Sequence, residues 1–279
     1  MATVIGQSGA WHAIVTDIAA RGHTISSPQD LQPLLAFLRT TRQDTIGAHR
    51  SYTMRAVAER SARIAQLKAE PGVIRWFLNG FEIGPLRRQV EALYSTDARY
   101  PAHLDQTIQR VEALPNSAEL AGAQAELAVI DHLQSLPDSF AVFNDVKLRA
   151  TRHIYFDGAA LQSAQLDHVV VGPNGVFAVE TKHWSREFAD SGNYHNPFDQ
   201  TRRANYLCYD LLRAAFGKTS VHSMIACLGS LPQPPDGAHV KVLRPEELHR
   251  YISGFGKVEF GSERLEQVRA FFAQRVASR

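Results

Sequence analysis

Residues 165–182 read QLDHVVVGPNGVFAVETK, and this stretch decides the fold class. Runs of Val, Leu and Phe on both sides of the GPNG turn predict a buried β-hairpin. Its charged residues Asp167, Glu180 and Lys182 are not explained by burial, because a charge in apolar surroundings is unfavourable unless it is paired or metal-bound. The hairpin therefore indicates a chemical site built into a sheet.

The three charged residues are expected near one end of the hairpin. Glu180 and Lys182 are two positions apart, so their side chains share one face of the strand. Asp167 lies near the same end of the neighbouring strand. Two converging carboxylates repel each other, and their hard oxygen atoms favour Mg²⁺ or Mn²⁺ as the compensating ion. A lysine beside them can orient a water molecule or stabilise developing negative charge.

The turn decides whether the two carboxylates share a face. A two-residue turn at Pro173 would place Asp167 opposite Glu180. Proline cannot adopt the positive φ of the favoured hairpin turns, so a type I turn followed by a left-handed Gly175 is predicted. That turn places Asp167 opposite Thr181, and a one-residue shift changes faces. Convergence of the carboxylates then requires a bulge or kink between the turn and the site.

Several further motifs occur in order around this hairpin. Together they resemble the nuclease-related domain (NERD), a branch of the PD-(D/E)XK nuclease superfamily, over about residues 118–228. An isolated E-x-K triplet is common by chance, whereas the ordered set is specific. The segments that carry the resemblance are GAQAE (122–126), FNDV (143–146), QLDHVVVG (165–172), GVFAVETK (175–182) and NPFDQ (196–200).

The resemblance implies an α/β fold, with a restriction-endonuclease-like core in which helices flank a mixed sheet. It also implies a role for each matching residue. Asp167 and Glu180 would hold Mg²⁺ or Mn²⁺ with the Thr181 backbone carbonyl, and Lys182 would be catalytic. Glu126 would complete the acidic cluster or bind a second metal ion. Gln200 would orient groups in the site. Superfamily members often carry a tyrosine four residues after that glutamine. This chain has Ala204 there, with Tyr206 nearby, which puts a tyrosine role in doubt.

Each assignment has a structural alternative. The hairpin charges could form a surface ion network, Glu126 could be an exposed helical residue, and Gln200 could simply open a helix. His168 and His183 adjoin site residues in sequence, so they point to the opposite strand face and are expected to be packed or partly exposed.

Three residues near the site are candidates for nucleic-acid contact. Trp184 could stack on a base or pack at the strand end. Arg202 and Arg203 could contact phosphates or form a solvated helix face.

The chain divides near Pro115-Asn116-Ser117. Residues 1–115 are predicted to form a helical N-terminal domain, and residues 116–279 a NERD-like nuclease domain with C-terminal helices. The predicted helices are one that Asp30 caps and those at 46–70, 85–94, 101–114, 118–136, 197–216, 245–253 and 262–276. The predicted strands are 140–148, 166–171, 176–182, 221–228 and 240–243, with a short hairpin around Asp157-Gly158.

The N-terminal domain is rich in arginine. Between Arg39 and Arg110 there are twelve Lys or Arg residues and seven Asp or Glu residues, a net charge of +5 in a chain whose total is +2. Such a module could grip a nucleic-acid backbone. Arginine is also simply a good helix former with a solvated stem. Thin apolar stripes on long helices offer a third use, contact between subunits of a homo-oligomer.

Composition bounds the class of protein. The 279 residues are 44% hydrophobic and 21% charged, as in ordinary globular proteins. Cys208 and Cys227 show no metal-ligand spacing and are expected in the core. No run of about 18 apolar residues predicts a membrane span, and the N-terminus lacks signal-peptide character. We expect a cytoplasmic protein without membrane contact.

The functional hypothesis is a metal-dependent nuclease that acts on DNA in preference to RNA. G-x-S-x-G, H-E-x-x-H and P-loop motifs are absent from the sequence. The alternative is a nucleic-acid-binding or regulatory module with a nuclease-like fold that does not turn over alone. The intact acidic set argues against this alternative.

Overall fold

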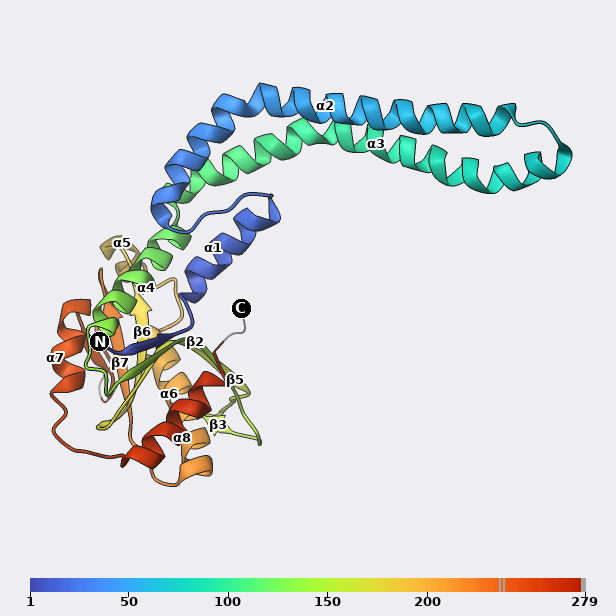
Figure 1. Ribbon diagram of the computed structural model, residues 1–279. Helices are drawn as coiled ribbons and strands as arrows, with labels where there is room; N and C mark the ends of the chain where they lie inside the picture. Colours follow the sequence, from blue (N-terminus) through green and yellow to red (C-terminus); the bar gives the residue numbers. More distant parts are fainter. Residues whose placement is uncertain (236, 238, 277–279) are drawn as a thin grey trace. The chain divides into compact units, whose positions relative to one another are not determined.

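The computed structural model describes residues 1–235, 237 and 239–276. The chain forms two compact units (Figure 1), one made of Met1–Ala20 with Asn116–Arg279 and one made of Arg21–Pro115. We call them the α/β unit and the helical unit. None of the described helices combines the length and apolar composition that a bilayer crossing requires.

The helical unit is a hairpin of two long helices, α2 (Leu31–Ala69) and α3 (Val73–Ala113), with 3₁₀ turns at Pro28–Asp30 and Leu114–Asn116. The predicted helix starts at Pro85 and Pro101 are wrong, because both prolines lie inside α3. Proline removes one helical hydrogen bond, and packing along α2 maintains the helix across both positions. Helix α2 likewise joins the two helices predicted around Asp30 and at 46–70.

Arginines of the helical unit fasten the two helices to each other. The ion pairs that run from α2 to α3 include Arg39–Glu112 at 2.5 Å, Arg42–Asp105 at 2.6 Å and Arg63–Glu82 at 3.3 Å. The Arg42 guanidinium binds both carboxylate oxygens of Asp105, and its second hydrogen bond is 2.8 Å long. Part of the positive charge is therefore used inside the hairpin, a role that the sequence did not indicate.

The α/β unit contains a mixed sheet and its covering helices. Its strands are β1 (Thr3–Ile5), β2 (Ala141–Arg149), β5 (Ser163–Gly172), β6 (Gly175–Lys182), β7 (Val221–Cys227) and β8 (Lys241–Leu243), with a separate ribbon of β3 (Tyr155–Phe156) and β4 (Ala159–Ala160). Its helices are α1 (Gly9–Ala20), α4 (Ala118–Gln134), α5 (Arg186–Ser191), α6 (Pro197–Phe216), α7 (Pro245–Ser253) and α8 (Ser262–Ala273). The predicted α/β class with a mixed sheet is confirmed.

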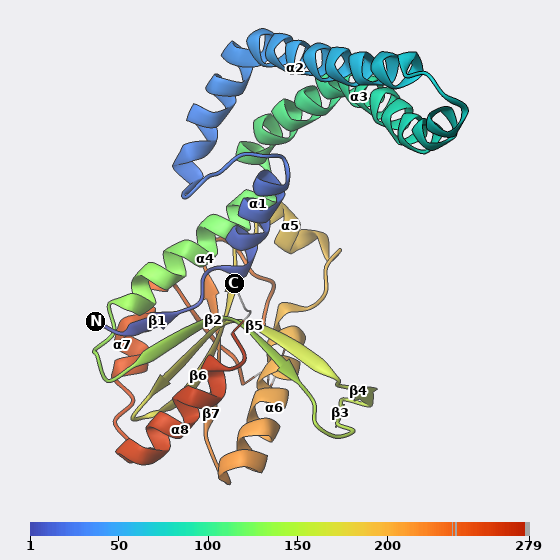
Figure 2. The ribbon, with the colours of Figure 1, turned by 45° about the vertical axis from the view of Figure 1, so that its right-hand side comes forward.

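The sheet has the order β1-β2-β5-β6-β7-β8. Strands β2, β5 and β6 form an antiparallel meander, whereas β1, β7 and β8 join in parallel. Helices α6 and α8 cover one face, and α4 and α7 cover the other (Figure 2). Both faces bury apolar side chains: Phe143, Val169 and Phe272 on the first, Val129, Phe177 and Leu248 on the second.

The first twenty residues belong to the α/β unit, which corrects the predicted domain 1–115. Strand β1 pairs in parallel with β2. Helix α1 packs against α4 and buries Trp11, Ile14 and Ile18. The sequence before residue 21 had no strong strand signal, and long-range pairing created the strand.

The hairpin turn also differs from the prediction. The β5–β6 register runs without interruption from Gly172 opposite Gly175 to His168 opposite Val179, so the turn has two residues. The Asn174 side chain donates to the carbonyl oxygens of Ile252 at 2.6 Å and Phe255 at 3.2 Å. These tertiary contacts fix a turn that local preference disfavours. Gly175 has the predicted positive φ, at +130°, but the predicted one-residue shift in pairing is absent, and no bulge interrupts the hairpin between Gly172 and His168.

Candidate active site

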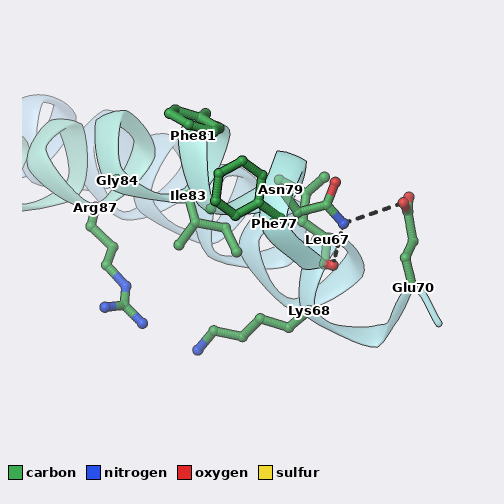
Figure 3. Close-up of a pocket in the computed structure, with 10 residues that line it drawn as sticks. Leu67, Lys68, Glu70, Phe77, Asn79, Phe81, Ile83, Gly84 and Arg87 are labelled. Carbon is green, nitrogen blue, oxygen red and sulfur yellow. Dashed lines mark hydrogen bonds between the residues drawn. The ribbon is translucent and has the colours of Figure 1, made fainter. Parts of the chain in front are cut away.

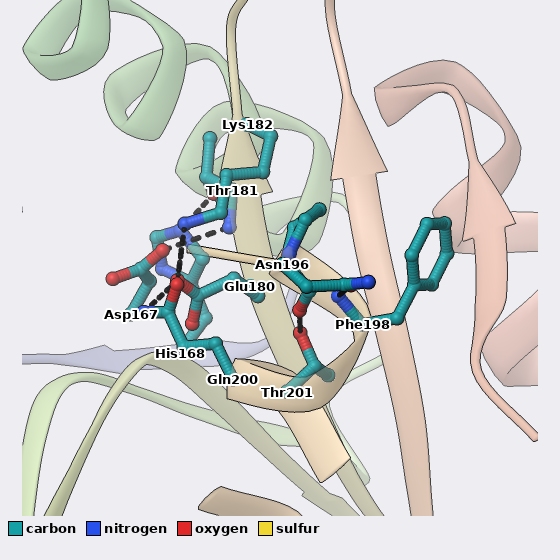
Figure 4. A network of polar contacts seen from close by, with 10 residues as sticks. Asp167, His168, Glu180, Thr181, Lys182, Asn196, Phe198, Gln200 and Thr201 are labelled. Carbon is teal, nitrogen blue, oxygen red and sulfur yellow. Dashed lines mark hydrogen bonds and ion pairs between the residues drawn. The ribbon is translucent and has the colours of Figure 1, made fainter. Parts of the chain in front are cut away.

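Strands β5 and β6 part at the end of the sheet where the acidic residues lie. Backbone pairing between them ends at His168 and Val179. Beyond this pair, the Thr181 N–H donates to Asp167 Oδ2 at 2.8 Å (Figure 4). Asp167 lies just beyond the last paired residue, and its carboxyl group is close enough to Glu180 for the two charges to act on each other. The sequence-predicted carboxylates are therefore brought together.

Glu180, Lys182 and Gln200 form a closed polar triangle. The Lys182 ammonium donates to Glu180 Oε1 at 2.7 Å and to Gln200 Oε1 at 3.3 Å. Gln200 Nε2 donates to the same Glu180 oxygen at 3.0 Å. Helix α6 thus delivers Gln200 to the carboxylate as the resemblance implied. Glu180 is only 4% exposed, so these bonds compensate a buried charge.

Glu126 reaches the site from α4 and binds the start of α1. Ser8 Oγ donates to Glu126 Oε2 at 2.7 Å, and the Ala10 N–H donates to the same oxygen at 3.3 Å. A carboxylate at a helix N-terminus is favourable. The exposed-helix alternative for Glu126 is wrong, because this residue joins the N-terminal segment to the acidic cluster.

The carboxylates perturb one another. Burial first, and then the charges of Glu180 and Glu126, raise the pKa of Asp167 well above its usual value. Burial, followed by the charges of Glu180 and Asp145, raises the pKa of Glu126. Such mutual repulsion among grouped acids indicates a place where added positive charge would be stabilising.

A buried polar chain lies behind Thr181. His168 Nδ1 contacts Asn144 Oδ1 at 2.8 Å, and its Nε2 contacts Thr181 Oγ1 at 3.0 Å. The amide oxygen can only accept, so Nδ1 carries the proton and Nε2 accepts from the hydroxyl. Burial lowers the pKa of His168 to about 3. His168 is therefore a neutral, packed residue, as its strand position predicted, and it orients Thr181.

In strands β2 and β5, the alternation of side chains between the two faces of the sheet is interrupted beside the site. Phe143 and Val146 face the same core cluster although they are three residues apart, and Leu166 and Val169 do the same. A regular strand repeats its faces every two residues, so each strand is irregular between these positions. On β2 the irregularity coincides with Asp145, whose φ is +52°.

Asp145 is a site residue that the sequence reasoning missed. It is buried, accepts from Gln165 Nε2 at 2.6 Å and lies 3.9 Å from the Lys147 ammonium. The available signal was a carboxylate inside an apolar strand, the same signal that identified Asp167.

The donor set fits a hard divalent cation. No three His, Cys, Asp or Glu side chains in the described part of the chain are grouped closely enough to form a ready metal cage. Magnesium is commonly held by one or two carboxylates, with substrate phosphates and water completing its shell. The neighbouring carboxyl groups of Asp167 and Glu180 match that sparser arrangement.

The three predicted nucleic-acid contacts are placed differently. Trp184 packs in an aromatic cluster with Phe188 and Tyr194, at centroid distances of 5.1 and 4.7 Å, as its strand-end alternative predicted. Arg202 is paired with acidic side chains, and Arg203 lies toward a groove beside Gln200.

Ala204 stands where superfamily members often carry a tyrosine, and Tyr206 is the nearest tyrosine in this part of the sequence. Ala204 belongs to the core face of α6. The Tyr206 ring packs against Phe156 at 5.0 Å.

The helical unit carries a pocket of its own (Figure 3). It has a volume of about 710 Å³ and includes Leu67, Phe77 and Ile83. The pocket shares no residue with the acidic site.

The family model described as nuclease-related domain matches residues 121–228. No curated protein matches the chain. Among solved structures, protein VC1899 from Vibrio cholerae matches with 10% identity and a TM-score of 0.29, over 91% of this chain. The match spans 59% of that chain.

Proposed function

Residues 121–228 belong to the nuclease-related domain family, and from this premise we propose that the chain is a metal-dependent nuclease. It hydrolyses phosphodiester bonds of nucleic acid, with DNA preferred to RNA. The observation that carries the proposal is the meeting of Asp167, Glu180 and Lys182 where β5 and β6 part.

The residues divide the work of hydrolysis. In the reaction, a water oxygen forms a bond to phosphorus, the ester P–O bond breaks, and the leaving oxygen gains a proton. Asp167 and Glu180 would hold Mg²⁺ or Mn²⁺ with the Thr181 carbonyl, and Glu126 would complete the acidic cluster. A bound divalent ion neutralises phosphate charge and lowers the pKa of water.

Lys182 places a positive charge beside the reacting phosphate. Its ammonium is fixed by Glu180 and Gln200, so little reorganisation is required when negative charge develops. Gln200 keeps the Glu180 oxygen oriented. The Thr181 N–H likewise orients the Asp167 carboxyl group by donating a hydrogen bond to it.

Cleavage assays test the proposal with matched variants. DNA and RNA are incubated with wild type in Mg²⁺, Mn²⁺ or EDTA. Lys182→Met and Asp167→Asn should lower cleavage by at least about 10²-fold, the usual scale for a lost charge-stabilising group. Lys257→Met and Asp138→Asn, at exposed positions, serve as controls and should retain activity. Equal cleavage by all four variants would contradict the assignment.

The second candidate is a binding or regulatory module without turnover. The ion pair that already joins Lys182 to Glu180 favours it. Salt-dependent binding without cleavage under any metal would select this candidate.

A further inference from the structure

A groove of about 600 Å³ adjoins the acidic site in the α/β unit. It lies between the start of β5 and the first turns of α6, and we call it the α6 groove. The residues that matter for its chemistry are Leu161, Gln165, His195, Gln200, Arg203 and Ala204. Its volume falls within the range of small-molecule sites.

Two glutamines connect the α6 groove to the acidic site. Gln200 lines the groove and donates to Glu180 at 3.0 Å. Gln165 lines it from β5 and donates to Asp145 at 2.6 Å. A polymer with its reacting group at the carboxylates would therefore extend directly into this groove.

The floor and rim of the groove differ in polarity. Leu161 and Ala204 are each only 4% exposed and supply an apolar floor. Gln165, His195 and Gln200 supply hydrogen-bonding groups around it. An apolar surface with a polar rim suits a planar base whose edges carry donors and acceptors.

The adjacent arginines Arg202 and Arg203 are in different electrostatic states. Arg202 lies 3.3 Å from Asp157 and 3.4 Å from Asp199, and its guanidinium sits over the Phe156 ring. Arg203 has no carboxylate partner in the described part of the chain, and its guanidinium donates to the Ala160 carbonyl at 3.5 Å. Arg203 therefore retains its charge for an anion, and a guanidinium suits phosphate.

The remaining acid at the groove is already compensated. Asp199 lines the groove, but Arg202 pairs with it. A phosphate beside Arg203 would therefore meet an acid whose charge is already partly neutralised. His195 adds a polar side chain to the same lining.

We propose that the α6 groove binds one unstacked nucleotide that neighbours the scissile phosphodiester. Its base lies on the floor of Leu161 and Ala204, and its phosphate pairs with Arg203. The proposal rests on the nuclease function proposed above and narrows its substrate class. A base inside a duplex cannot enter such a groove without leaving its stack, so single-stranded or frayed substrates are favoured over continuous duplex.

Binding in EDTA tests the groove independently of cleavage. The full chain is titrated with a fluorescent single-stranded oligonucleotide, and with its duplex, by anisotropy. Single strand should bind more tightly than duplex. Arg203→Gln should weaken binding by about tenfold, the size of one charge-assisted contact. It should also reduce the slope of log affinity against log salt by about 1. Arg213→Gln, at an exposed position in the last turn of the same helix, is the matched control and should change affinity by less than about twofold.

A second measurement separates the base from the phosphate. Leu161→Asn makes the floor polar and should reduce the single-strand preference. Unfolding midpoints of all variants identify loss of fold, and Ala204→Ser provides a milder floor variant. Equal affinity of wild type and Arg203→Gln, or duplex binding that equals single-strand binding, would overturn the groove proposal.

The groove proposal and the nuclease proposal fail separately. Arg203-dependent binding without cleavage in any metal would support the groove and refute nuclease activity. Metal-dependent cleavage whose rate and affinity are unchanged in Arg203→Gln would support the nuclease and refute the groove.

Discussion

Thr181 connects the acidic site to the interior of the sheet. Its N–H donates to Asp167, and its hydroxyl meets the buried His168. The side chain lies on the face opposite to those of Glu180 and Lys182 because neighbouring residues alternate along a strand. One residue therefore transmits the packing of the core to the position of a carboxylate.

Removing the Thr181 hydroxyl should destabilise the fold. Thr181→Val keeps the side-chain shape but leaves His168 Nε2 buried without a donor, which should lower the free energy of unfolding by about 1–3 kcal/mol. Urea unfolding gives the value. The control Thr151→Val, at an exposed position, should stay within about 0.5 kcal/mol of wild type. A Thr181→Val midpoint equal to wild type would refute the role of this hydrogen bond.

The raised pKa of Asp167 predicts a pH-dependent stability difference. The pKa is higher in the folded chain than its ordinary 3.8, so the protonated carboxyl stabilises the fold below that pH, and this contribution is lost as pH rises through the folded pKa. In EDTA, Asp167→Asn should therefore become more stable than wild type as pH rises from about 4 to 8. Thermal unfolding across this range measures the difference. A wild type that is more stable than Asp167→Asn at pH 8 in EDTA would contradict it.

At the scale of elements, α3 shows how packing overrides a local signal. It runs for 41 residues with Pro85 and Pro101 inside it. Each proline lacks a backbone N–H and disfavours the preceding turn. The long interface with α2, with its arginine ion pairs, offsets that penalty. The two prolines therefore predicted ends of helices, whereas packing against α2 keeps α3 continuous.

Replacing a helical proline should stabilise the helical unit. Pro101→Ala restores a backbone donor and a good helix former, so the free energy of unfolding should rise by up to about 3 kcal/mol. Circular dichroism during heating reports the helical transition. Pro115→Ala, which lies beyond α3, is the control and should show no comparable gain. A lower melting temperature for Pro101→Ala would show that the proline is required for the packing.

At the scale of the whole molecule, the α/β unit is built from two segments that are separate in the sequence. Residues Met1–Ala20 complete the α/β unit, and the helical unit is inserted between them and Asn116. Strand β1 extends the sheet, while α1 buries Trp11 and Ile14 and meets Glu126 through Ser8. The acidic cluster therefore includes a contact made by the beginning of the chain.

This arrangement predicts that two truncations will behave differently. A chain that starts at residue 21 loses the burial of Trp11, Ile14 and Ile18, worth about 1.5–3 kcal/mol each. That sum is comparable with the total stability of a domain, so β2 should lose its protection from hydrogen exchange. Replacing residues 21–115 with a flexible Gly-Ser linker should preserve this protection. Equal protection of β2 in both chains would refute the assignment of the N-terminal segment.

The sequence by itself determined the α/β class, most of its element boundaries and the composition of the acidic hairpin. Helix α6 and strand β6 lie where their patterns predicted. These features depend on local periodicity and on charges that stand out within apolar strands. The ordered motifs likewise identified the nuclease-related family that the comparison confirms.

Only the tertiary structure decided the register, the extent of the unit and the partners of the site. Asn174 fixes a two-residue turn through carbonyls about eighty residues away. Asp145 and Ser8 join the cluster through contacts that span long stretches of chain. Arg202 and Arg203 are identical in sequence signal, yet only the fold pairs one with carboxylates. Local pattern fixes which side chains face the core, whereas convergence of distant side chains depends on three-dimensional packing.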